Sequence, residues 1–124
     1  MAKRQPDPND VDSFLPLPAS VMHIIVALAA GERHGYAIMR DIEELSSGSV
    51  RMGPGTLYGS IKRMIEQGLV EEAEERPDPA LDDQRRRYYR LTDLGRRVGV
   101  AEQYRLSSLL DAARIRDLGL GGLP

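Results

Sequence analysis

The sequence of 124 residues contains no cysteine, no tryptophan and only one phenylalanine. Without cysteine, the chain forms no disulfide bond and offers no thiolate to a metal ion or as a nucleophile. With so few aromatic rings, the hydrophobic core must be largely aliphatic. No apolar run approaches the roughly 18 residues of a membrane-spanning helix, and the first residues lack the apolar stretch of a secretory signal. These absences predict a cytoplasmic protein.

The sequence also has no large excess of either charge, since it contains 17 Lys and Arg and 19 Asp and Glu. This balance excludes a chain coated with basic residues for nucleic acid, but it leaves room for one basic face. The length suits a single domain with one appended element.

Residues 1–16 are polar and contain three prolines. Proline removes backbone donors and this segment offers little to bury, so we predict a flexible arm. The alternative, an arm that reaches into a DNA groove, depends on Lys3 and Arg4, whose charge is offset by nearby aspartates.

Three helices are predicted next, because apolar residues recur at helical spacing over residues 18–30, 35–45 and 54–67. Pro54 suits a first helical turn, and Gly68 suits a helix end. The short connection between the second and third helices is typical of a helix-turn-helix.

Residues 69–75 and 84–92 read as two strands around a polar loop, with Tyr89 and Leu91 on the inner face. Such a hairpin directly after a helix-turn-helix is a wing. Residues 93–118 are predicted to form a long helix that Thr92 or Asp93 can cap, and we expect residues 119–124 to be a flexible tail. The predicted fold is therefore mainly α with a small β-hairpin (α+β). It comprises a winged helix-turn-helix over residues 17–92 and a C-terminal helix for dimerisation.

Basic residues concentrate in residues 50–70 and 85–90, where seven Lys and Arg face one acidic residue, Glu66. Clustered cations suit a phosphate backbone, although a solvated strand edge would also carry them. The N-terminal half of the second helix of a helix-turn-helix enters the major groove. The candidate DNA-binding residues are Gly55, Thr56, Tyr58, Gly59, Ser60, Lys62, Arg63, Arg85, Arg86 and Arg90.

Other chemistry finds little support in the sequence. The glycines at 53, 55 and 59 match neither a dinucleotide-binding loop nor a nucleotide triphosphate loop. His23 and His34 share no face and lack cysteine partners, so we expect no metal site, and His34 is better explained as a capping or turn residue. We assign no catalytic residue and no cofactor, and we do not expect an enzyme.

The final helix carries an apolar stripe that no later segment of the sequence covers, and an exposed stripe usually marks an interface. The candidate dimerisation residues are Leu94, Val98, Ala101, Leu106, Leu109 and Ala113. A two-fold dimer presents two recognition helices, so its operator should be an inverted repeat.

Three segments match a known family in order and spacing: HGYAIMRDIEE at 34–44, GPGTLYGSIKRMIEQGLVEE at 53–72 and RRRYYRLTDLGRR at 85–97. Over most of residues 15–118 the chain resembles the PadR family of winged-helix transcriptional regulators. Gly55-Thr56-Leu57-Tyr58 with Leu69-Val70 is fairly specific, whereas the ending from Tyr88 to Gly95 is shared with other winged-helix regulators.

The resemblance implies a homodimeric DNA-binding protein, usually a repressor, of the small subgroup with one C-terminal helix. It implies a recognition helix over about 54–67, a wing over about 69–92 and a helix over about 93–118 that packs against the partner. Some small members bind planar aromatic drugs between subunits through a tryptophan on this helix, where this chain offers only Tyr104.

Three functions stay open on sequence alone. The first is a dimeric repressor that binds double-stranded DNA. The second is a winged-helix module that binds protein, since a fold does not fix a function. The third is a switch with a small-molecule effector, for which the sequence carries no signature beyond the resemblance.

Overall fold

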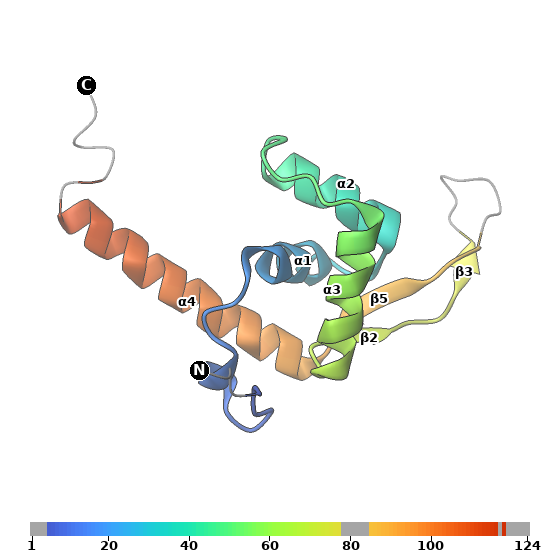
Figure 1. Cartoon of the computed structure of the whole chain (residues 1–124), viewed down its shortest axis with the longest axis horizontal. Helices are drawn as coiled ribbons and strands as arrows, with labels where there is room; N and C mark the ends of the chain where they lie inside the picture. The colour runs from blue at the N-terminus through green and yellow to red at the C-terminus, as the bar shows by residue number, and fades with distance from the viewer. Residues whose placement is uncertain (1–4, 78–84, 117, 119–124) are drawn as a thin grey trace.

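The structure, a computed structural model, describes residues 5–77, 85–116 and Leu118 (Figure 1). These residues form one short 3-10 helix, four α-helices and five short strands. The elements are η1 (Val11–Phe14), α1 (Ala19–Ala29), β1 (Arg33–His34), α2 (Gly35–Leu45), α3 (Pro54–Glu66), β2 (Val70–Glu72), β3 (Arg76–Pro77), β4 (Arg85–Arg86), β5 (Tyr88–Leu91) and α4 (Asp93–Ile115). The predicted fold class is confirmed, as a three-helix head with a wing and a long final helix.

The head is held together by an aliphatic core between α1, α2, α3 and the sheet. Each helix contributes residues at helical spacing, so that one face of each is removed from water. The fully buried side chains at the centre are Ile24, Leu28, Ile38, Ile42, Leu57, Ile61, Met64, Leu69, Val70 and Val98. As predicted, only a few aromatic rings take part.

Side chains fix where the helices begin. His34 accepts a hydrogen bond at Nδ1 from the Ala37 N–H over 3.1 Å, so the predicted capping role of His34 is confirmed. Pro54 opens α3 at a position where a proline costs no hydrogen bond. Gly68 follows α3 with φ of +78°, a conformation that favours glycine.

The sheet has three antiparallel strands in the order β1-β5-β2, with Val70 opposite Leu91 and Glu72 opposite Tyr89. Tyr89 and Leu91 face the core, as predicted. The third strand, β1, was not predicted. β3 and β4 pair as a second two-stranded ladder that extends the hairpin away from the head (Figure 1). The predicted loop at its tip, residues 78–84, lies outside the described residues.

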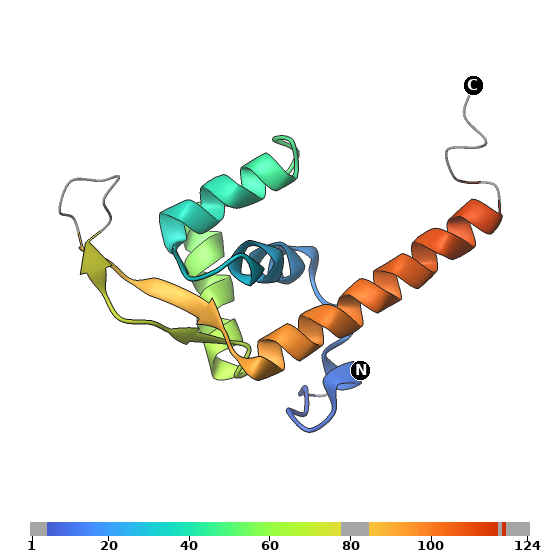
Figure 2. The same cartoon turned by 180° about the vertical axis from the view of Figure 1, so that it is seen from behind.

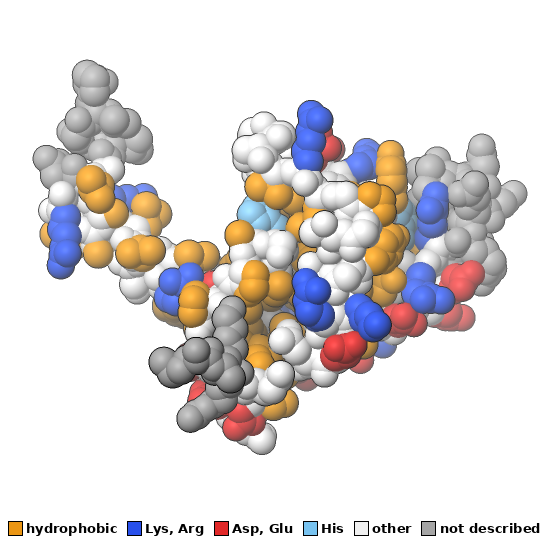
Figure 3. All heavy atoms as spheres, viewed as in Figure 1, with side chains coloured by type: hydrophobic (Ala, Val, Ile, Leu, Met, Phe, Trp, Pro, Cys, Tyr) orange, Lys and Arg blue, Asp and Glu red, His pale blue; other side chains and the backbone are white. Residues whose placement is uncertain are grey.

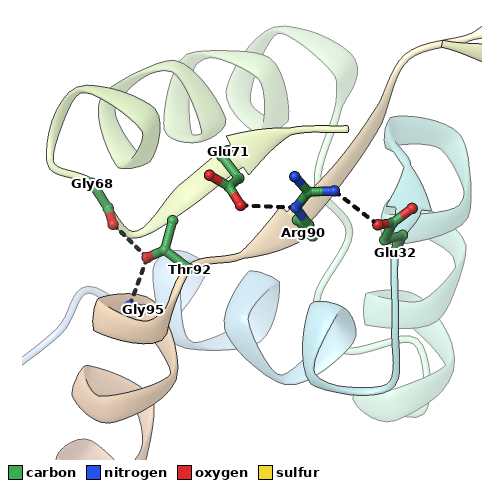
Figure 4. Close-up of polar contacts among 6 residues, drawn as sticks. All are labelled: Glu32, Gly68, Glu71, Arg90, Thr92 and Gly95. Atoms are coloured by element: carbon green, nitrogen blue, oxygen red, sulfur yellow. Dashed lines mark hydrogen bonds and ion pairs between the residues drawn. The ribbon is translucent and has the colours of Figure 1, made fainter. Parts of the chain in front are cut away.

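The start of α4 is locked onto the end of α3 by Thr92 (Figure 4). Its Oγ1 donates to the Gly68 carbonyl and accepts from the Gly95 N–H at 3.0 Å, which caps the helix as predicted. A Cβ atom at Gly95 would lie 2.0 Å from the Leu69 carbonyl oxygen. Glycine at 95 therefore allows the first turn of α4 to lie against the backbone of Leu69, the residue before β2.

The N-terminal segment departs from the prediction of a flexible arm. Residues 11–14 form η1 against α4, and Phe14 is buried in the core. The Leu17 N–H donates to Glu102 Oε2 over 2.8 Å, which ties the segment before α1 to α4. The prediction failed because it weighed the polar composition and overlooked one buried ring. Residues 1–4 lie outside the described residues.

The two halves of α4 have different surroundings. Its first half packs on α1 and η1, whereas its second half projects away from the head in both views (Figures 1 and 2). The predicted helix over residues 93–118 ends earlier, at Ile115, and the predicted tail of residues 119–124 lies outside the described residues.

Candidate nucleic-acid interface

The exposed face of α3 carries most of the residues that the sequence singled out. Leu57, Ile61 and Met64 turn inward to the core, which leaves the other side of the helix to solvent. Gly55, Thr56, Lys62 and Arg63 are exposed and Gly59 is partly exposed. A Cβ atom at Gly55 would meet nothing within 4 Å, and one at Gly59 would meet only the Arg63 guanidinium at 3.9 Å. The helix backbone is therefore open to a partner here.

Ser60 is the exception, and its predicted place on the outward face is wrong. It is only 1% exposed and belongs to the buried stripe with Leu57, Ile61 and Met64. Its spacing from these three residues is the i, i+3, i+4, i+7 pattern, which a reading of residue type alone overlooks. Its hydroxyl accepts a long hydrogen bond from Arg63 Nη2 over 3.4 Å.

Tyr58 is half-exposed and rests against the start of α2. A Cβ atom at Gly35 would lie 2.2 Å from the Tyr58 hydroxyl oxygen, so glycine makes the space for this phenol. Burial, and then the neighbouring Tyr58, raise the pKa of Tyr89 in the sheet. Tyr58 therefore joins α3 to α2, and 45% of its surface stays open.

Lys62 and Arg63 have no acidic partner among the described residues, whereas several other cations of the head do. Arg51 pairs with Glu43 at 3.5 Å, and Arg87 pairs with Glu72 at 3.5 Å. Figure 3 shows Lys and Arg side chains over the lower part of α3 and again toward the wing. The α3 face thus keeps two positive charges available for an external anion.

Arg90, a candidate DNA contact, is held on the outer face of the sheet (Figure 4). Its Nε donates to Glu71 Oε1 over 2.8 Å and its Nη1 to Glu32 Oε2 over 3.2 Å. These hydrogen bonds, first to Glu71 and then to Glu32, raise the pKa of Arg90. Arg90 therefore links β5 to β2 and to the turn before β1. This structural role is favoured over the predicted contact of Arg90 with a DNA phosphate.

The other wing candidates lie on β4. Arg86 is partly buried beside the partner strand β3, and its register partner is Arg76. Arg85 is placed on the strand, but its side chain is outside the described part of the chain. Arg86 therefore lies on the wing, as predicted, and is not part of the exposed face of α3.

The apolar stripe of α4 is divided between the core and the surface, which corrects the predicted dimerisation set. Val98 is 0% exposed and belongs to the core of its own chain, and Leu94 packs against that core. Ala101 and Ala113 are partly exposed, whereas Leu106 and Leu109 are open to solvent. The prediction followed periodicity alone, and periodicity does not reveal that α1 covers the first half of the stripe.

The second half of α4, residues 103–115, is mostly exposed, and we call it the bare half of α4. A groove of about 480 Å³ lies where this half begins. The sequence did not single out its α1 residues, although α1 is apolar on more than one face, a sign that a second face is covered. The lining residues are Leu17, Ala19, Met22, His23, Val26, Leu45, Glu102, Arg105 and Leu106.

Two further kinds of site find no support within the described ranges. No three His, Asp or Glu side chains there come together as a possible metal site. None of the helices described combines the length and the hydrophobicity needed to span a bilayer.

Comparison with known proteins decides the family. The profile of the transcriptional regulator PadR-like family matches residues 24–99, which include the core of the head, the wing strands and the start of α4. This chain belongs to the PadR-like family of transcriptional regulators. The sequence resemblance is thereby confirmed.

Two curated relatives each align with 88 residues, or 71%, of the chain. Over it, the chain is 34% identical to the transcriptional regulator Rv3488 of Mycobacterium tuberculosis and covers 76% of that protein. It is 38% identical to an uncharacterized 37.1 kDa protein of transposon TN4556 from Streptomyces fradiae, but spans only 23% of its length.

Solved structures share the fold. A PadR family transcription regulator from Clostridium difficile R20291 superposes with a TM-score of 0.66 at 20% identity, covering 82% of this chain and all of that one. PadR of Bacillus subtilis in complex with operator DNA gives a TM-score of 0.55 at 21% identity, covering 66% of this chain and 45% of that one.

Proposed function

We propose that this PadR-like regulator is a homodimeric repressor that binds double-stranded DNA, with α3 in the major groove. The exposed edge of α3 carries the proposal, because Lys62 and Arg63 have no acidic partner in the described residues while Arg51, Arg87 and Arg90 are each paired with a glutamate. A recognition helix needs such an edge, with cations for phosphate or guanine and small residues for close approach. Gly55, Thr56 and Gly59 supply the small side chains.

The wing is proposed to lie along the sugar–phosphate backbone. β3 and β4 project beyond the head on the same side as the start of α3 (Figure 1), and they bring Arg85 and Arg86 to the far end of the ladder. The complex of the B. subtilis relative with operator DNA supports DNA as the partner.

Dimerisation is proposed to occur through the bare half of α4. Leu106, Leu109 and Leu110 are 41–61% exposed, and such a run of apolar surface on a projecting helix is typical of an interface. A two-fold dimer would bury the same face on both copies. Each dimer would then present two α3 helices to one duplex.

Selection of bound sequences from a random duplex pool tests this function. We expect enrichment of an inverted repeat with half-sites separated by about 10–10.5 base pairs or a multiple of that spacing. Failure to enrich any duplex would contradict DNA binding, and enrichment of one unrepeated half-site would contradict the dimer. A repressor further requires that the enriched site, placed at a promoter, lowers transcription when the protein is added.

A further inference from the structure

The start of α2 carries two side chains that the sequence did not single out. Tyr36 is 45% exposed and Arg40, one helical turn later, is exposed on the same side. The Arg40 guanidinium carbon lies 5.9 Å from the centroid of the Tyr36 ring. This cation–π distance holds the guanidinium in one position while leaving its N–H groups toward solvent.

Arg40 keeps its positive charge available although acids surround it on its own helix. Glu43 is engaged by Arg51 at 3.5 Å and Asp41 by Arg33 at 3.9 Å. No ion pair joins Arg40 to either of these residues or to Glu44 in the described structure. An arginine fixed by a ring rather than by a carboxylate keeps its planar set of donors for an external anion.

Aromatic contacts connect this pair to the α3 edge. Tyr36 stacks on His34 with ring centroids 6.4 Å apart, and His34 meets Tyr88 edge-on at 5.4 Å. The Tyr58 phenol of α3 covers Gly35, directly before Tyr36 in sequence. The first turns of α2 and α3 also lie next to each other in both views (Figures 1 and 2). Tyr36 and Arg40 therefore continue the surface of α3.

We propose that Tyr36 and Arg40 form a second contact to the DNA backbone, on the strand that flanks the groove occupied by α3. The proposal rests on the proposed function and extends its site from α3 to α2. A guanidinium binds phosphate oxygens through two parallel N–H donors, and a phenol donates one more hydrogen bond. Neither group reads a base here, so the contact contributes affinity and register for every sequence.

Binding of a fluorescein-labelled duplex of random sequence, titrated over a range of salt, tests the proposal. Arg40→Gln removes the charge, and we expect affinity to fall several-fold and the slope of log K against log salt to flatten by about 0.9 for each phosphate that the protein no longer neutralises. Arg40→Lys keeps the charge without the planar fork, so the slope should remain while affinity falls. Tyr36→Phe keeps the ring, so affinity should fall slightly at constant slope.

Arg114→Gln, on the polar side of α4 near its far end, is the matched control and should leave the titration unchanged. If the wild type binds and Arg40→Gln matches this control in affinity and slope, the proposal is overturned while the proposed function stands. A loss of affinity at unchanged slope in Arg40→Gln would also overturn it. If the wild type itself binds no duplex, the proposed function fails. Circular dichroism melting should be the same for all variants.

Discussion

Two glycines of this chain serve opposite purposes. Gly95 is required by packing, because the Leu69 carbonyl oxygen occupies the place of its Cβ atom. Gly59 lies within a helix, where glycine is unfavourable, yet nothing but the Arg63 guanidinium lies near it. We infer that the first glycine serves the fold and the second serves the approach of a partner.

Gly95→Ala should destabilise the protein by about 1–3 kcal/mol, because α4 must move away from the Leu69 carbonyl group to admit a methyl group. Urea unfolding at one fixed protein concentration measures the change. An unchanged midpoint would show that α4 is not held tightly against the Leu69 backbone.

Gly59→Ala should raise the free energy of unfolding by about 0.5–1 kcal/mol, since alanine costs less than glycine in a helix. The same variant should bind duplex DNA more weakly, because the methyl group keeps α3 from the groove. Stability and affinity are measured on one preparation. If both rise, Gly59 has no role in close approach.

The role of a single residue can be predicted from the sequence when residues close to it in the chain determine that role. The caps at His34 and Thr92 depend on adjacent backbone and were predictable. The burial of Ser60 follows from its helical spacing with Leu57 and Ile61, so this error came from weighing residue type above spacing. Arg90 depends on Glu71 and Glu32, which are distant in sequence. Tertiary structure therefore determines the role of Arg90, and the sequence alone could not reveal it.

Between elements, α4 is joined to the segment before α1 by one carboxylate. Glu102 is buried and accepts from the Leu17 N–H over 2.8 Å and from Arg105 Nη2 over 3.1 Å. The Arg105 guanidinium, and to a smaller extent the Leu17 N–H, hold the pKa of Glu102 below its ordinary value. The charged form is therefore the form that stabilises this junction.

Because folding lowers the pKa of Glu102, its contribution to the free energy of unfolding depends on pH. A carboxyl group whose pKa is lowered by folding contributes fully above its unfolded pKa of about 4.3, and its contribution is lost as pH falls through the folded pKa. Glu102→Gln removes this titration. The variant should cost roughly 1–3 kcal/mol at neutral pH and should lose less stability than the wild type below about pH 4.3.

Thermal melting of both proteins between neutral and acid pH checks this prediction. The two curves of stability against pH should converge on acidification. Parallel curves would show that Glu102 does not carry the acid sensitivity of the junction.

Helices long enough to show a repeating apolar pattern could be predicted from the sequence, and short elements could not. The bounds of α2 and the start of α3 match the sequence prediction. The strand β1 has two residues, which is too few for any period to show, and it exists because β5 offers a free edge. η1 was hidden because a single side chain, Phe14, anchors it.

For the whole molecule, the bare half of α4 is the feature that a single chain leaves unexplained. Leu109 is 61% exposed on the same face of α4 as the groove residue Leu106. Leu109→Lys should convert the proposed dimer to a monomer, because a buried ammonium on both copies is costly. The expected mass from sedimentation equilibrium is halved, and duplex affinity falls with it.

Ser107→Lys is the matched control, since it adds the same charge on the polar side of α4, which also carries Asp111 and Arg114. This control should stay dimeric. If Leu109→Lys keeps the mass of the wild type, the proposed dimer interface is wrong. The sequence located the apolar stripe on this helix but could not assign its first half to the core.

The central claim is that the outward edge of α3 lies against duplex DNA. The most direct measurement compares the wild type with the double variant Lys62→Ala, Arg63→Ala in fluorescence anisotropy titrations of duplex DNA over a range of salt. We predict weaker binding by the variant and a salt slope that flattens by about 0.9 for each phosphate that Lys62 or Arg63 neutralises in the wild type. Equal affinity and equal slope for the two proteins would contradict the account.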